Sequence, residues 1–489
     1  MLAALLALLC AATGLLLVLL LWPRESALKA NWLLQGSLSL GCGLGLFSVI
    51  FMLSRATGGQ YLLAIDLVVF ALLLAGYLYR NRLPAVTTTV SLSSEELDPH
   101  WLPLILRAAF AIALLAALYS AILRTVAHPH GDGWDAFAIW NLHARFLFRG
   151  GVHWRDGFTP LIPWSHPDYP LLLPASIAHF WTALGRENQI VPAMIGLVFT
   201  FSTVGLLFSS LARLRGQISA ILGGLTLLTT PFFIEQGTAQ YADVPLSFFI
   251  LATIVLICLH ENSAGVRRRS GLPVLAGIYC GFAGWTKNEG LLFLLAILTS
   301  QLLDFFMPRR RSDTTDAHSQ PHITRESFRE ASSSFVPFLA GIAPLLLLVA
   351  WFKRSVPASN ELFSSIAFSK LLDSSRYLAI LKWYGKDFLR FGDWFLVPGT
   401  VLLAALYFAS PANLIPAPNS GSRACLIAIV MTFAGYFVIY IITPYDLYWH
   451  LRFSLNRLFL QLWPAAIFLF FLRIPIRELT PSKAKTVSK

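Results

Sequence analysis

The sequence predicts an all-α, polytopic membrane protein with about thirteen transmembrane helices. Of its 489 residues, 56% are hydrophobic and only 13% are charged, and the mean hydropathy is +0.66. Apolar runs of roughly 20 residues recur along the chain, and a run of this length spans a bilayer as a helix. Because lipid offers no partner to backbone N–H and C=O groups, each run must satisfy them internally, which makes every span helical.

The thirteen runs that are expected to cross the membrane cover approximately residues 2–22, 31–53, 60–79, 103–123, 190–211, 217–234, 244–260, 271–286, 289–306, 335–352, 395–410, 424–443 and 457–473. The first run has no basic segment before it, so it is interpreted as a membrane helix rather than a removed signal peptide. The apolar stretch 170–184 is short and carries His179, which favours a helix lying at the membrane interface.

Basic residues indicate which helix ends face the cytoplasm. With these spans, one set of loops holds Arg267–Arg269, Arg309–Arg311 and the Lys/Arg-rich tail. Cytoplasmic loops carry an excess of Lys and Arg, whereas long loops translocate largely regardless of charge. The net charge of +12 is therefore attributed to membrane topology and not to nucleic-acid binding. The long loops 124–189 and 353–394 then face the periplasm or another exoplasmic space.

The first exoplasmic loop contains the stretch HGDGWDAFAIWNLHARFLFRGG, residues 130–151. Asp132 and Asp135 frame a Gly-Trp turn just before a pattern typical of a helix on the bilayer surface. An aspartate at a helix start often acts as an N-cap, so a structural and a catalytic role are both open for each.

Four further polar clusters fall on the same predicted side of the membrane. They are WSHPDYPLLLP with His166 and Asp168, EQGTAQYADVPLSFF with Tyr241 and Asp243, GWTKNEG with Lys287 and Glu289, and TPYDLYWHLRFSLNRL with His450, Arg452 and Arg457. Ionisable residues at membrane depth are costly and usually mark a site. Carboxylates and cations that converge on one face suit a site that binds an anionic group and moves a proton. Lys and Arg also match the oxygens of a lipid phosphate.

Metal binding has less support in the sequence. The histidines His130, His143, His153 and His166 lack the close ligand spacing of zinc sites, and the five cysteines lie in apolar runs without CxxC spacing. A divalent ion held by Asp132 or Asp243 stays open as an alternative, and no other cofactor is expected.

The order of these motifs resembles the GT-C-fold glycosyltransferases that use polyprenyl-phosphate sugars. After the acidic turn come HPDYPLLLP, YADVPLSFF and GWTKNEG, which are similar to the family's HPP-L-like, D-P-L-like and T-K-G elements. The later RFSLNRLFLQLWPA resembles the R-[FY]-x-L-P segment of one branch, the dolichyl-phosphate-mannose protein mannosyltransferases and aminoarabinose transferases. The resemblance covers roughly residues 103–473.

This resemblance implies an inverting transfer of a sugar from an undecaprenyl- or dolichyl-type phosphate to an exoplasmic protein or glycolipid. An acid of the first loop would be the catalytic base, which by position is Asp135 or Asp132, and Asp243 matches a second functional acid. The residues expected to bind the donor phosphate are Lys287, Arg452 and Arg457, and those expected to contact substrate are His166, Asp168, Tyr241, Glu289 and His450.

The expected organisation follows from the spans and the resemblance. It comprises three N-terminal transmembrane helices (1–102), a GT-C-like catalytic core (103–306), a cytoplasmic linker (307–334), C-terminal transmembrane helices (335–473) and a cytoplasmic tail (474–489). Within loop 353–394, Leu378, Leu381, Trp383 and Phe388 could line one face of a surface helix.

Two other classes of protein fit the sequence less well. A transporter or lipid-carrier flippase places polar residues and broken helices near the bilayer midplane, often in repeated halves. Here the polar clusters lie at one end of the predicted helices and no repeat is visible. A non-catalytic membrane partner would have no need of carboxylates and cations gathered on one side, so the transferase is favoured.

Overall fold

The computed structural model describes residues 1–23, 31–56, 58–82, 101–262, 271–306, 325–357, 369–394, 399–409 and 420–474. Throughout these ranges the regular secondary structure is helical, without a strand, as the sequence predicts. The helices are α1 (Leu2–Leu21), α2 (Trp32–Ala56), α3 (Leu62–Arg82), α4 (Trp101–Ala127), α5 (Asn141–Arg149), α6 (Leu172–Leu184), α7 (Ile190–Arg215), α8 (Gln217–Leu228), α9 (Pro231–Thr238), α10 (Asp243–Glu261), α11 (Leu272–Thr286), α12 (Asn288–Phe306), α13 (Arg325–Ser355), α15 (Ser374–Arg390), α16 (Gly399–Ala409), α17 (Ser420–Ile442) and α18 (Leu447–Arg473).

A polytopic membrane protein is confirmed, although the count of thirteen spans is not. Among the described residues, nine helices are long and apolar enough to cross a membrane, or ten if the bent pair of α8 and α9 counts as one span. The other three predicted spans coincide with the shorter apolar helices α11, α12 and α16. The predicted linker 307–334 and tail 474–489 fall largely outside the described residues.

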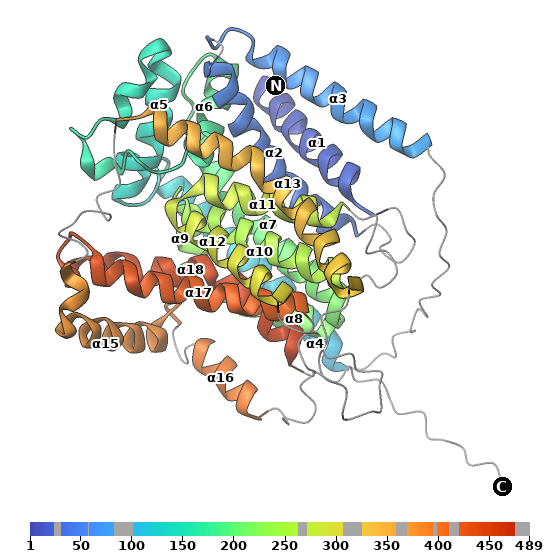
Figure 1. The fold of residues 1–489 in the computed structure, drawn as a ribbon, viewed down its shortest axis with the longest axis vertical. Coiled ribbons are helices and arrows are strands. Elements are labelled where there is room, and N and C mark those ends of the chain that lie inside the picture. The colour runs from blue at the N-terminus through green and yellow to red at the C-terminus, as the bar shows by residue number, and fades with distance from the viewer. Residues whose placement is uncertain are drawn as a thin grey trace.

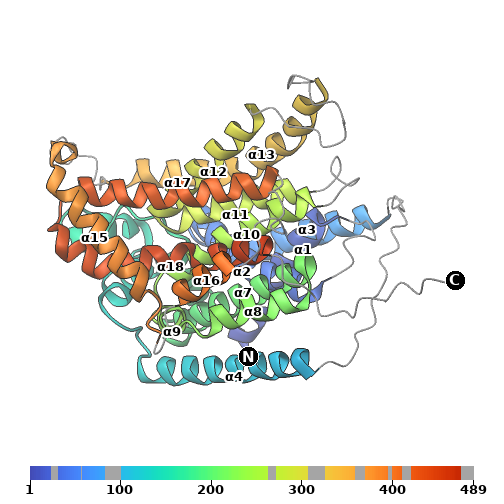
Figure 2. The ribbon, with the colours of Figure 1, turned by 90° about the horizontal axis from the view of Figure 1, so that it is seen from below.

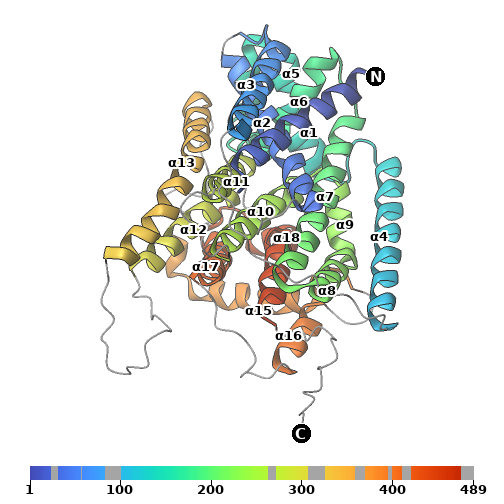
Figure 3. The ribbon, with the colours of Figure 1, turned by 90° about the vertical axis from the view of Figure 1, so that its right-hand side faces the viewer.

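Helix α10 forms the centre of the bundle, because 94% of its span is buried. It packs against α7, α11, α17 and α18, and Figure 1 shows these helices grouped around it. Figure 3 shows α4 at the edge of the bundle, where it contacts α8 and α9 and buries only 11% of its span. The remaining surface of α4 is apolar, as expected for a helix that faces lipid.

The N-terminal helices α1, α2 and α3 form a group beside this core (Figure 1). A methyl group on Gly14 would lie 2.0 Å from the carbonyl oxygen of Ser39, so glycine permits the close contact of α1 with α2. The guanidinium of Arg80 in α3 donates a 2.6 Å hydrogen bond to the carbonyl oxygen of Leu19 at the end of α1. This bond satisfies one of the carbonyl groups that a helix end leaves unpaired.

The predicted short helix within residues 170–184 is present as α6, and its polar residue His179 is buried inside the protein. Every residue of α6 from Leu172 to Trp181 is buried, mainly against α2 and α5. The Nε2 atom of His179 lies 3.0 Å from the carboxylate of Asp66 in α3, and both side chains are completely buried. His179 therefore connects α6 with the N-terminal helices, a contact that is distant in sequence.

Several helices share one end of the bundle, and the polar residues lie there. Helices α4, α11, α13 and α17 end on this side, whereas α10, α12 and α18 begin on it. Figure 2 shows α15 packed across the same ends of α17 and α18. The helix predicted within loop 353–394 is thus present, and its Leu378, Leu381 and Phe388 are exposed.

Candidate active site

Asp243 is the centre of a buried ion-pair network. The carboxylate is fully buried and accepts from Lys287 Nζ at 3.0 Å, from Arg457 at 2.9 and 3.0 Å, and from Gln461 Nε2 at 2.6 Å. Asp243 is the first residue of α10 and makes no capping hydrogen bond. A buried charge is costly unless it is paired and hydrogen-bonded. Asp243 therefore acts through these three partners and not as an N-cap.

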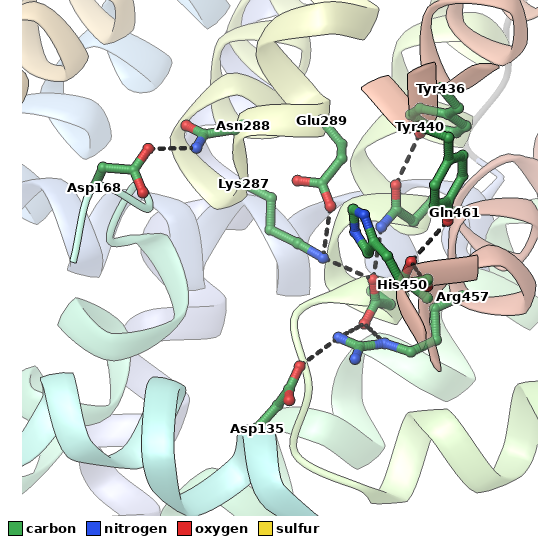
Figure 4. Close-up of polar contacts among 12 residues, drawn as sticks. Asp135, Asp168, Lys287, Asn288, Glu289, Tyr436, Tyr440, His450, Arg457 and Gln461 are labelled. Atoms are coloured by element: carbon green, nitrogen blue, oxygen red, sulfur yellow. Dashed lines mark hydrogen bonds and ion pairs between the residues drawn. The ribbon is translucent and has the colours of Figure 1, made fainter. Parts of the chain in front are cut away.

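Arg457 joins this network to the first loop. Its Nη2 atom lies 2.7 Å from a carboxylate oxygen of Asp135, and its guanidinium lies 4.7 Å from the ring centre of Tyr241. Asp135 keeps 21% of its side chain exposed, so a substrate group can reach it. Figure 4 shows Asp135 pointing toward Arg457 from below.

Two glycines bend the chain so that Asp135 reaches this position. Gly131 and Gly133 have φ values of +89° and +83°, in a region of backbone conformation that residues other than glycine rarely adopt. A Cβ atom on Gly133 would lie 2.4 Å from the hydroxyl oxygen of Tyr241. The turn is thus both left-handed and closely packed against the loop that precedes α10.

The same turn directs Asp132 away from the network. Its carboxylate pairs with Arg124 of α4 at 2.9 Å, and Arg124 also lies 3.6 Å from Glu235 of α9. Of the two aspartates that the sequence left open, the structure places Asp135 and not Asp132 beside Arg457.

The loop WSHPDYP forms the opposite wall of the site. Asp168 accepts a 2.8 Å hydrogen bond from Asn288, and Lys353 of α13 lies 3.3 Å from the same carboxylate and 2.9 Å from the amide oxygen of Asn288. Figure 4 shows Asp168 and Asn288 facing each other. Together with a bond from Lys353 to the backbone carbonyl of Asp168, these contacts attach the loop to α12 and α13.

Stacked rings fill the space between this loop and the network. His166 has a left-handed backbone, with φ of +48°, and its ring stacks on Tyr169 at 4.9 Å. Tyr169 in turn stacks on Trp140 at 5.7 Å and lies 5.6 Å from the Lys287 ammonium. The stack is fully buried at Trp140 and partly buried at Tyr169 and His166.

Burial sets the protonation of two groups at this site. It lowers the pKa of His166 below its ordinary value, although the carboxylates of Asp135 and Asp168 act in the opposite direction. It also raises the pKa of Tyr241 to about 12, with Asp135 contributing in the same direction. At neutral pH both side chains are therefore uncharged, and each can offer a proton in a hydrogen bond to substrate.

Of the remaining predicted residues, one belongs to the network and two lie outside it. Glu289 pairs with Lys287 at 2.9 Å and is part of it. His450 bonds to Thr443 at 2.9 Å, farther along the wall that α17 and α18 form. Arg452 is exposed and lies in a separate pocket between α15 and α18.

The described residues contain no group of three or more His, Cys, Asp or Glu side chains placed to hold a metal ion. In addition, the oxygens of Asp243 are taken by cationic and amide donors, and Asp132 is paired with Arg124. A divalent ion on either aspartate remains a sequence-based expectation.

Comparison with known proteins gives one family match, over part of the chain. The model of the dolichyl-phosphate-mannose-protein mannosyltransferase family matches residues 188–319. This match is consistent with a GT-C-type glycosyltransferase. It supports a membrane glycosyltransferase that uses a polyprenyl-phosphate sugar in general. No curated protein and no solved structure matches the chain significantly.

The matched segment covers only part of the site. Asp243, Lys287 and Glu289 lie inside residues 188–319, whereas Asp135 and Arg457 lie outside it. The structure adds these two residues to the matched ones through the ion pairs of Arg457. The contacts, and not the family match, therefore define the complete cluster.

Sequence reasoning missed three residues, two in the network and one on the opposite wall of the site. Gln461 donates to Asp243, Tyr436 of α17 donates to the Gln461 oxygen at 2.8 Å, and Lys353 holds Asp168. Gln461 follows Arg457 by four residues and so shares its helix face, a signal that could have revealed it. Tyr436 and Lys353 carry no such signal, because aromatic and basic residues are common near membrane helix ends.

Proposed function

We propose that this protein transfers a sugar from a polyprenyl phosphate to an acceptor hydroxyl at the exoplasmic face, with inversion at the anomeric carbon. The observation that carries the proposal is the bridge from Asp135 through Arg457 to the buried Asp243–Lys287 pair. It joins one partly exposed carboxylate to two cations at a single end of the helical bundle. Transfer from a lipid phosphate needs such a base and such a phosphate-binding group together.

Asp135 is the proposed base. It takes the proton of the acceptor O–H group while the acceptor oxygen attacks the anomeric carbon. The bond from that carbon to the phosphate oxygen breaks on the opposite face, and its electron pair stays on the leaving lipid phosphate. The transfer thus needs no oxidant or reductant.

Lys287 and Arg457 are proposed to bind the donor phosphate. Negative charge grows on the phosphate as the glycosyl bond breaks, so fixed cations stabilise the transition state more than the ground state. Asp243 keeps both cations in place and, with Gln461, limits their movement.

The pairing of Asp135 with Arg457 suggests an order of events. When the donor phosphate occupies the guanidinium, it competes with Asp135 for the same N–H groups. The displaced carboxylate loses a stabilising positive partner and becomes a stronger base. Donor binding would thereby activate Asp135 at the moment when an acceptor can use it.

The remaining residues are proposed to contact the sugar and the acceptor. The uncharged His166 and Tyr241 can donate hydrogen bonds to sugar hydroxyl groups, and Asp168, Glu289 and His450 extend this polar wall. The acceptor is proposed to be a protein or a glycolipid. The active site is proposed to face the periplasm or another exoplasmic space, because the opposite helix ends adjoin the most basic loops.

The proposal is tested by transfer from radiolabelled polyprenyl-phosphate sugars to membrane acceptors, with Asp135→Asn compared against Asp132→Asn. A positioned general base contributes about 10²–10⁴-fold, so Asp135→Asn should reduce transfer by that factor. Asp132→Asn should retain most of the activity, because Asp132 pairs with Arg124 outside the network. Full transfer by the Asp135→Asn variant would disprove the assignment. Reporter fusions after residues 150 and 320 test sidedness, and equal reporter signals at both would contradict the proposed orientation.

A further inference from the structure

A second polar cavity lies between α15 and the first turns of α18, and we call it the α15–α18 pocket. It has a volume of about 640 Å³, and Lys386, Arg390 and Arg452 contribute three cations to its lining. In the part of the chain that the structure describes, these cations make no ion pair with a carboxylate, in contrast to Lys287 and Arg457. None of the three cations is therefore held in an ion pair by the described residues, although two carboxylates also line the pocket.

Two acids, Asp387 and Asp393, share the pocket with the three cations. Burial raises the pKa of Asp387 above its ordinary value even though Lys386 and Arg390 act in the opposite direction. Burial likewise raises the pKa of Asp393. Even with both carboxylates charged, the three cations of the lining outnumber them by one.

The pocket opens beside exposed aromatic side chains of α18. The start of α18 exposes Tyr448, Trp449 and Phe453, with 54–59% of each accessible, and all three line the pocket. Aromatic side chains of this kind concentrate at membrane–water interfaces, and amphipathic helices lie in them.

The three cations and the apolar rim together limit the kind of molecule that can bind in the pocket. A free phosphate ion would use the three cations but not the apolar rim, and an uncharged lipid would use the rim but not the cations. A lipid with a phosphate head group matches both parts, because arginine and lysine bind phosphate oxygens while the lipid chain lies along the exposed aromatic side chains of α18. The cation of Lys386 is also placed over the Trp383 ring at 4.4 Å, at the border of the two parts.

We propose that the α15–α18 pocket binds the phosphate head group of an anionic membrane lipid, separately from the Asp135–Arg457–Asp243 network. This inference goes beyond the proposed transferase activity and does not depend on it. The pocket would hold lipid at the membrane surface on the side of the molecule where the proposed active site lies.

Binding is tested with the full-length protein in nanodiscs of phosphatidylcholine. The probe is fluorescent phosphatidylglycerol, and the competitors are undecaprenyl phosphate, unlabelled phosphatidylglycerol, phosphatidylcholine and inorganic phosphate. The expected result is displacement by either anionic lipid and much weaker displacement by the other two. Stronger displacement by undecaprenyl phosphate than by phosphatidylglycerol would identify the bound lipid as a carrier lipid. Equal displacement by the two would identify it as a bulk phospholipid. Both results support lipid binding in the α15–α18 pocket.

Variants locate the bound lipid. The double variant Lys386→Gln/Arg452→Gln should weaken binding about tenfold or more, because two charge-assisted contacts are lost. Lys382→Gln is the matched control, since Lys382 is exposed on the same helix but does not line the pocket. Thermal unfolding of each variant checks that it is folded.

Three results would overturn the inference. They are wild-type binding by the double variant, displacement by phosphatidylcholine equal to that by the anionic lipids, and displacement by inorganic phosphate equal to that by lipid phosphates. The two competitor results come from the wild-type protein, so they decide the matter even if the double variant fails to fold. Because the readout is binding and not transfer, its failure leaves the proposed function untouched.

Discussion

The guanidinium of Arg457 lies 2.7 Å from the carboxylate of Asp135, which places the proposed base and a proposed phosphate ligand in direct contact. The same guanidinium also binds Asp243 at 2.9 Å. A lysine offers one point charge, whereas the planar fork of arginine can bind two carboxylates at once. The residue type at position 457 therefore determines whether the first loop and the buried network are connected.

Replacement of this arginine should affect donor binding and catalysis together. Arg457→Lys is expected to lower kcat/KM for the polyprenyl-phosphate donor by about 10–100-fold, because charge-assisted hydrogen bonds contribute about 1.5–3 kcal/mol each. Steady-state kinetics with varied donor concentration measures the effect. The control is Arg149→Lys, which changes a mostly exposed pair with Glu187 and should leave kinetics unchanged. Wild-type kinetics in Arg457→Lys would separate Arg457 from the donor site.

Removal of the buried carboxylate should destabilise the fold. Asp243→Ala leaves Lys287 and Arg457 without their shared partner, and breaking a buried ion pair costs about 3–5 kcal/mol. The midpoint of thermal unfolding in detergent should therefore fall clearly, and Asp243→Ala/Lys287→Met should recover part of the loss. Asp446→Ala is a suitable control, because it removes an exposed N-cap bond to Trp449 that contributes only about 1 kcal/mol. Equal unfolding midpoints for Asp243→Ala and Asp446→Ala would show that the network is not stabilising.

Substitution in the glycine turn should reduce transfer even though Gly133 is exposed. Gly133→Ala must adopt a φ of +83° and also place a methyl group 2.4 Å from the Tyr241 hydroxyl, so we expect Asp135 to move and transfer to fall at least about tenfold. Gly151→Ala is matched to it, since Gly151 also has a positive φ of +53° but has open space around its Cβ position. If both variants lost transfer to a similar extent, the cause would be backbone strain alone, and the contact with Tyr241 would have no separate effect.

The pattern of apolar runs was enough to predict a helical bundle. It also predicted that the polar residues lie at one end of that bundle. The positions of Asp243, Lys287 and Arg457 at predicted helix ends on one side already indicated that they could converge. Their distances follow from the packing of α10, α11 and α18, and no pattern within a single helix contains that information. The sequence therefore predicted the charged members of the cluster, but neither its ion pairs nor the contribution of Gln461 and Tyr436.

Two features could not be predicted for the same reason. The separation of Asp132 from Asp135 depends on a turn packed against Ala239 and Tyr241, residues that are remote in sequence. The buried partner of His179 is Asp66, which lies on a helix far from it in the chain. The separation of Arg452 from Arg457, in contrast, follows from helix periodicity, because residues five apart do not share a helix face.

A buried histidine near the site should make stability depend on pH. Burial lowers the pKa of His143 to about 3, helped by His166 and opposed by Asp168, whereas an exposed histidine has a pKa of about 6.5. Between these two values the unfolded chain binds one proton more than the folded chain, so stability falls as pH decreases from about 6.5 toward 3. The slope from this one group is about 1.4 kcal/mol per pH unit. His143→Phe removes the group, and its unfolding midpoint should change less between pH 6.5 and 4.5 than that of wild type. Parallel pH profiles for the two proteins would show that His143 is not neutral and buried in the folded state.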